Sequence, residues 1–136
     1  EFELLAGREA RSHAAVREAL TTLRGRGPSR VLITSLTTQE TPAGCLDMAA
    51  GDANGLWLLR TPRLDAYFHG AGDVTAALFL AHLLRGGDLR AALSRAGSSL
   101  AGLLARTMAA GGGELALIAA QEEFLSPSRT FQAEPL

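Results

Sequence analysis

The segment Gly70-Ala71-Gly72-Asp73 has the residue types and spacing best suited to chemistry in this sequence. Its two glycines permit a tight turn. A helix that begins here would leave its first backbone N–H groups unpaired at the positive end of the helix dipole. Such groups bind phosphate and stabilise the negative charge that develops during phosphoryl transfer. Asp73 would stand beside them as a base that accepts the proton of a hydroxyl, so the sequence predicts an anion site next to a candidate catalytic base.

A purely structural role for this segment is the alternative, in which the glycines make a turn and Asp73 caps the helix. Short glycine motifs often match by accident. The surroundings favour a function, because the segment follows two candidate strands and opens an apolar helix, which places an acidic side chain at the edge of a core. A P-loop is excluded, since no Gly-Lys-Ser or Gly-Lys-Thr follows the glycines.

A helix and a strand are predicted near the start of the chain. Ser12 can cap a helix whose apolar residues share one face and which ends at the Gly and Pro residues within 25–28. Residues 30–36 form a continuous apolar and β-branched run, typical of a strand that is buried on both faces. A helix followed by a buried strand predicts an α/β architecture.

A hairpin is predicted between this strand and the glycine motif. Residues 45–50 and 55–61 are two short strand candidates, separated by the turn residues 52–55. The pair Asn54-Gly55 favours the positive φ angles that tight hairpin turns require.

Two helices are predicted after the motif. Residues 73–85 are apolar nearly all round, so we expect a buried helix whose packing face holds Val74, Ala77, Leu78, Ala81 and Leu84. A second helix is capped by Asp88 and runs to the glycines at 111–113. The small residues within 96–102 would let a neighbouring element approach this helix closely.

Length and composition fit a globular protein without a strongly charged binding surface. The chain has 136 residues, of which 47% are hydrophobic and 20% charged, enough to bury a core. The net charge of −1 gives no electrostatic footprint for nucleic acid or an anionic membrane. One cysteine, Cys45, rules out an internal disulfide and a Cys-x-x-Cys metal site. Without a run of 18 apolar residues or a signal peptide, we expect a soluble cytoplasmic protein.

The motif and further segments resemble one group of kinases. Residues 65–77 are similar to the anion-hole and catalytic-base signature of the ribokinase superfamily, whose usual form is Gly-Thr/Val-Gly-Asp. Ala71 departs from the usual form at a position that contributes its backbone amide. Within the superfamily, residues 31–35 resemble the strand of pyridoxal kinases that ends at the nucleotide phosphates. The end of those kinases is similar to residues 114–121, Pro127 and residues 131–133.

The resemblance implies a role for each matching position. Asp73 would be the catalytic base and contact the substrate hydroxymethyl group, and the backbone amides of Gly70, Ala71 and Gly72 would form the anion hole. ATP would be contacted by Thr34, Ser35, Thr61, Pro62, Arg63 and Leu64. Glu3 resembles the acidic residue of the family's Asn-x-x-Glu motif, which helps hold Mg²⁺ through water. The Asn of that motif would lie one residue before Glu1, so the metal site would be incomplete in this chain.

The resemblance also implies a fold and an activity. Residues 1–136 would be the C-terminal part of a single ribokinase-like kinase domain, a three-layer α/β/α fold with a mostly parallel central sheet. The implied reaction is phosphorylation of the 5′-hydroxymethyl group of pyridoxal, pyridoxine or pyridoxamine, with ATP and Mg²⁺, in vitamin B6 salvage. K⁺ is a further candidate cofactor. Family members are commonly homodimers, so we expect a homodimer.

Two alternatives stay open. A kinase for hydroxymethylpyrimidine shares the Gly-x-Gly-Asp signature, although the tail favours pyridoxal. The other alternative is a non-catalytic fragment that binds nucleotide or pairs with another subunit, because the chain begins at Glu1 without Met and resembles only the second half of the family's chain. The vitamin-binding residues would then lie outside it. We expect these 136 residues alone to be poorly stable or associated, and catalytically inactive.

Overall fold

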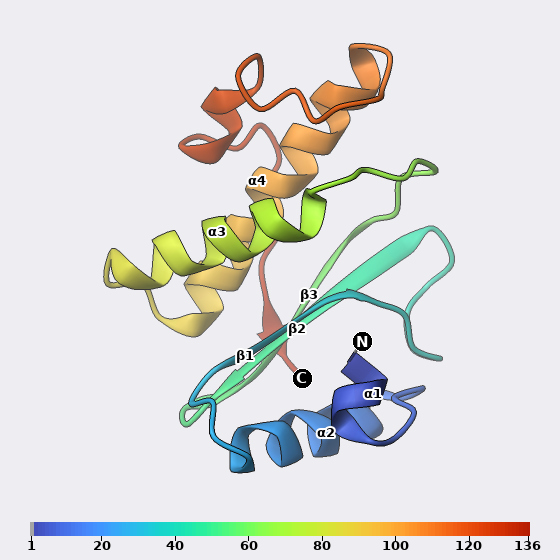
Figure 1. The fold of residues 1–136 in the computed structure, drawn as a ribbon, viewed down its shortest axis with the longest axis vertical. Coiled ribbons are helices and arrows are strands. Elements are labelled where there is room, and N and C mark those ends of the chain that lie inside the picture. The colour runs from blue at the N-terminus through green and yellow to red at the C-terminus, as the bar shows by residue number, and fades with distance from the viewer. Residues whose placement is uncertain (1) are drawn as a thin grey trace.

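The computed structural model describes residues 2–136, in which helices lie on both faces of a four-stranded sheet (Figure 1). Two helices, α1 and α2, lie on one face, and α3 and α4 lie on the other, which gives three layers. The elements in chain order are α1 (Phe2–Ala6), α2 (His13–Gly25), β1 (Val31–Leu36), β2 (Cys45–Asp52), β3 (Gly55–Pro62), α3 (Ala71–Leu84), α4 (Leu89–Ala109), the 3₁₀-helix η1 (Gln121–Phe124) and β4 (Glu134–Pro135). The predicted α/β class and layered arrangement are confirmed.

The strands of this chain pair antiparallel in the order β1-β2-β3-β4, which differs from the mostly parallel sheet that we expected. The connections explain the difference, because parallel neighbours need a crossover of about a dozen residues or more. Residues 37–44 join β1 to β2 without a helix. The predicted hairpin joins β2 to β3, with Asp52 opposite Gly55 and the Asn54 N–H donating to Asp52 Oδ1 at 2.8 Å.

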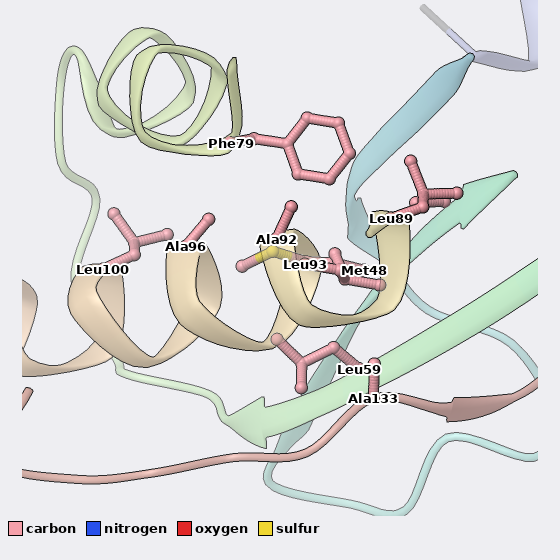
Figure 2. Packing of buried hydrophobic residues seen from close by; sticks show 10 residues of the cluster. Met48, Leu59, Phe79, Leu89, Ala92, Leu93, Ala96, Leu100 and Ala133 are labelled. Carbon is pink, nitrogen blue, oxygen red and sulfur yellow. The ribbon is translucent and has the colours of Figure 1, made fainter. Parts of the chain in front are cut away.

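The larger core lies between the sheet and α4 (Figure 2). Met48 of β2, Leu59 of β3 and Leu93 of α4 are buried there, and Phe79 of α3 packs against the same cluster. The helix can approach the sheet because residue 97 is glycine, where a Cβ would lie 2.1 Å from Leu59 Cδ2. The close approach predicted at the small residues of α4 is therefore confirmed.

A smaller core joins α2 to the opposite face of the sheet. Val16 and Leu20 of α2 pack with Ile33 of β1 and Ala49 of β2. The helix starts where the sequence predicts, since the Ser12 side chain accepts a hydrogen bond from the Ala15 N–H at 3.2 Å.

The burial predicted for α3 is wrong. Only Thr75 and Phe79 of this helix are buried, whereas Leu80 and Leu84 are 55% and 79% exposed. The helix lies against α4 (Figure 1), and its buried residues are on one side. Because it is apolar nearly all round, the sequence has no polar side to indicate which face packs.

Within residues 2–136, no helix combines the length and the apolar character needed to span a membrane.

Candidate functional site

The predicted anion site lies at the N-terminus of α3. Gly70 is the N-cap residue, with φ +81° in the left-handed region that favours glycine. The first helical hydrogen bond runs from the Val74 N–H to the Gly70 C=O at 3.0 Å, so the N–H groups of Gly72 and Asp73 lie ahead of the helical ladder. In the part of the chain that the structure describes, no side chain caps this end of α3. The exposed Asp73 carboxylate is therefore not used as a helix cap.

A pocket of about 880 Å³ lies beside this helix end. Ala71 and Gly72 form one part of its lining, and the apolar side of α4 forms another, with Gly97, Leu100, Ala101 and Leu104. The pocket is also lined by every residue that the resemblance assigns to ATP: Thr34, Ser35, Thr61, Pro62, Arg63 and Leu64. The fold thus gathers residues from β1, β3, α3 and α4 around a space with polar groups near α3 and an apolar wall at α4.

Asp73 and Gly70 do not line that pocket but belong to a second one of about 700 Å³. His69 lines the second pocket, and Tyr67 lines both, with its ring edge-on to the His69 ring at a centroid distance of 4.9 Å. The first turn of α3 therefore belongs to both pockets, with the candidate base on one and two of the candidate anion-hole residues on the other.

The strand β1 is interrupted at the two residues assigned to the ATP phosphates. Ile33 pairs with Ala49, but Leu36 pairs with Asp47, so the register shifts between them. Ser35 has φ +54°, the one positive φ at a non-glycine residue in the described part of the chain. Such backbone is uncommon outside glycine and gathers at functional sites. The bulge turns Thr34 and Ser35 out of the regular ladder, and both are exposed where they line the pocket.

An ion pair with a buried carboxylate fixes the strands and the loop next to this bulge. Asp47 of β2 is fully buried, and Arg60 of β3 donates to it twice, from Nε to Oδ1 at 2.8 Å and from Nη2 to Oδ2 at 2.9 Å. The hydrogen bond to Asp47 raises the pKa of Arg60. Thr41 donates to Asp47 Oδ2 at 2.8 Å and accepts from the Thr38 N–H at 2.8 Å. The loop that follows Ser35 is therefore tied to the sheet.

The residue assigned to Mg²⁺ does not join the other candidate residues. Glu3 lies in α1 and lines neither of the two pockets, and its Oε1 accepts a hydrogen bond from the Ala10 N–H at 3.1 Å. Within residues 2–136, no three His, Cys, Asp or Glu side chains are grouped so that they could hold a metal ion. The described residues therefore do not make a metal site by themselves.

Comparison with known proteins decides the family. The sequence model of the phosphomethylpyrimidine kinase family matches residues 1–117. The chain belongs to this family. It is 46% identical to the pyridoxal kinase PdxY of Granulibacter bethesdensis, covering 98% of this chain and 48% of the relative. It is 40% identical to the pyridoxal kinase PdxY of Corynebacterium diphtheriae, covering 100% of this chain and 48% of the relative.

A solved structure with the same fold is the pyridoxal kinase of Leishmania donovani in complex with ADP. The TM-score is 0.87 at 22% sequence identity, and the match covers 100% of this chain and 48% of that chain. The ribokinase-like fold expected from the resemblance is confirmed. This chain spans about half the length of these relatives.

Two parts of the larger pocket were not predicted from the sequence. The α4 wall was expected to pack closely but not to border a ligand space, since small residues indicate only close approach. Arg129, which also lines the pocket, follows a polar turn near the end of the chain and carried no signal of function.

Proposed function

We propose that the protein containing this chain transfers the γ-phosphoryl group of ATP to the 5′-hydroxymethyl group of pyridoxal, pyridoxine or pyridoxamine. The proposal rests on one observation, the position of the first turn of α3 between two pockets. Its Ala71 and Gly72 line the pocket with the candidate ATP contacts, and its Asp73 lines the other. The pyridoxal kinase names of the relatives support the acceptor, and the ADP complex of the Leishmania protein supports the nucleotide.

In the proposed reaction, Asp73 accepts the proton of the hydroxymethyl group as the oxygen of that group attacks the γ-phosphorus. A new O–P bond forms while the bond from phosphorus to the β–γ bridging oxygen breaks, and ADP leaves. The amides of Gly70 and Gly72 would stabilise the negative charge of the transferring group, together with the Ala71 amide once it leaves its 3.4 Å hydrogen bond to the Phe68 C=O. Thr34 and Ser35 would hold the phosphates, and residues 61–64 would lie along the nucleotide.

Mg²⁺ belongs to the proposal as a cofactor of the ATP phosphates, with Glu3 as a contact through water. Because the described residues do not make a metal site by themselves, no step is assigned to the ion. K⁺ as a further cofactor and a homodimer are proposed from the family resemblance, and a cytoplasmic location from the sequence features given above.

Phosphorylation of hydroxymethylpyrimidine is the second candidate function, favoured by the description of the matching family as phosphomethylpyrimidine kinase. Its acceptor is also a hydroxymethyl group, so Asp73 and the amides of α3 would act in the same way. A non-catalytic role as a nucleotide-binding or pairing fragment is the third.

The test is an ATP-dependent phosphorylation assay on the full-length natural protein that carries this chain. The three B6 vitamers and hydroxymethylpyrimidine are compared by kcat/KM. We expect the highest value for a B6 vitamer, and no turnover by the 136-residue chain alone. A higher kcat/KM for hydroxymethylpyrimidine would select the second candidate, and ATP binding without transfer to any acceptor would select the third.

A further inference from the structure

Arg129 lines the larger pocket from a part of the chain that is remote in sequence from the rest of the lining. The other lining residues lie between Thr34 and Ala105, whereas Arg129 comes after η1. Its side chain is exposed, and among residues 2–136 no carboxylate forms an ion pair with it. A planar cation is thus placed at the pocket with its charge unmatched by the protein.

The backbone on both sides of Arg129 is held by hydrogen bonds. The Ser128 N–H donates to Glu123 Oε2 at 2.8 Å, and the Phe131 N–H donates to Ser98 Oγ at 2.9 Å. Ser98 belongs to α4 and is buried. The segment that carries Arg129 is therefore tied to α4, and α4 and Arg129 line the same pocket.

Glu123 is a buried carboxylate whose hydrogen bonds hold this segment. The side chain is 2% exposed. Burial raises its pKa, but the hydrogen bonds from Ser128 and Arg106 outweigh burial, so the pKa of Glu123 lies below its ordinary value. A buried charge is unfavourable unless it is fully paired. Here one oxygen accepts from Arg106 Nε at 3.2 Å, and the other accepts from the backbone that precedes Arg129.

The chemistry of the pocket decides which part of a nucleotide Arg129 would meet. The proposed phosphate contacts lie at β1 and α3, while Gly97, Leu100 and Ala101 of α4 offer an apolar wall suited to a flat base. Guanidinium groups stack on aromatic faces and donate hydrogen bonds in their own plane. We propose that Arg129 binds the adenine base of ATP against α4 and that Glu123 positions it. This inference rests on the proposed use of ATP.

The test measures nucleotide binding to the full-length natural protein by calorimetry, with ATP and with adenosine, which has the base but no phosphates. Arg129→Ala is expected to raise the dissociation constants of ATP and adenosine by the same factor, about tenfold. Arg129→Lys keeps the charge but loses the plane, so it should weaken binding nearly as much. Arg17→Ala, at an exposed arginine of α2 on the other face of the sheet, is the control and should change neither.

Kinetics then separate binding from a general loss of structure. Arg129→Ala and Glu123→Gln should raise the KM for ATP while kcat at saturating ATP stays within about twofold. Unchanged ATP affinity in Arg129→Ala, or a loss confined to ATP with adenosine unaffected, would overturn the inference. If the natural protein phosphorylated no B6 vitamer and Arg129→Ala still weakened both ligands, the proposed acceptor would be wrong and the inference would hold.

Discussion

Glu123 occupies the space that a side chain on residue 102 would need. A Cβ added to Gly102 of α4 would lie 2.0 Å from Glu123 Oε2 and 2.6 Å from the carboxyl carbon. The absence of a side chain at Gly102 therefore allows a buried carboxylate to reach both Arg106 and the Ser128 N–H. One glycine in α4 determines the course of the C-terminal segment.

Gly102→Ala should destabilise the protein, because the methyl group forces Glu123 away from its two partners. We expect a loss of about 1–3 kcal/mol in the free energy of unfolding. Gly25→Ala in α2 is the matched control, since a Cβ there meets nothing within 4 Å, and alanine favours a helix over glycine by about 0.5–1 kcal/mol. Urea unfolding of the two variants measures the difference, and equal stability of the two would contradict the packing at Gly102.

The stability contributed by Glu123 should depend on pH. Its pKa in the folded state is lowered below the ordinary value of 4.5. The stabilisation is therefore fully present above pH 4.5 and is lost as the pH falls from there through the lowered folded pKa. Glu123→Gln has no such titration, so its unfolding free energy should fall less steeply in this window. Urea unfolding from about pH 7 to about pH 3 measures both profiles, and parallel profiles would contradict the assignment.

The Asp47–Arg60 pair, with its buried carboxylate, should contribute more to stability than an ion pair exposed on both sides. Asp47→Ala leaves Arg60 and the Thr41 hydroxyl without their shared acceptor, and we expect a loss of about 3 kcal/mol. Glu18→Ala breaks the exposed pair with Arg8 and should cost at most about 1 kcal/mol. Thermal unfolding compares the two, and a similar change in both would show that burial of Asp47 does not matter.

Two substitutions at Ser35 distinguish the contribution of its hydroxyl group from the strain of its left-handed backbone. Both Ser35→Ala and Ser35→Gly remove the hydroxyl, so both should raise the KM for ATP if that hydroxyl contacts phosphate. Glycine tolerates φ +54° and alanine does not, so Ser35→Gly should be more stable than Ser35→Ala by about 1 kcal/mol. Melting temperatures measure the difference. A more stable alanine variant would contradict the bulge geometry.

Local patterns predicted the elements that depend on local chemistry. Ser12 caps α2, Asn54-Gly55 turns the hairpin, and Gly70 opens α3, each because the residue type satisfies a backbone requirement at that position. The motif also predicted the position of the candidate site, at the first turn of α3 between the two pockets. That prediction was possible because the free amides of a helix N-terminus are a local property of the chain.

Properties set by contacts distant in sequence were not predictable. The apolar composition of α3 gave no indication that only Thr75 and Phe79 would be buried. The position of Arg129 depends on hydrogen bonds of Glu123 and Ser98 that join the tail to α4. Ser98 and Phe131, for example, are 33 residues apart in sequence. The antiparallel pairing of β1 and β2 follows from the short connection at residues 37–44. The sequence prediction gave more weight to the family resemblance, which implies a mostly parallel sheet.

Asp73 is the proposed base for phosphoryl transfer to a hydroxymethyl group, and the whole assignment depends on it. The most direct test is the rate of ATP-dependent phosphorylation of pyridoxal by the full-length natural protein and its Asp73→Asn variant, at saturating ATP. The asparagine keeps the shape of the side chain and cannot accept the proton. We predict that kcat falls by about 10²–10⁴-fold while ATP affinity is retained. A kcat within a few-fold of the unmodified protein would contradict the role of Asp73.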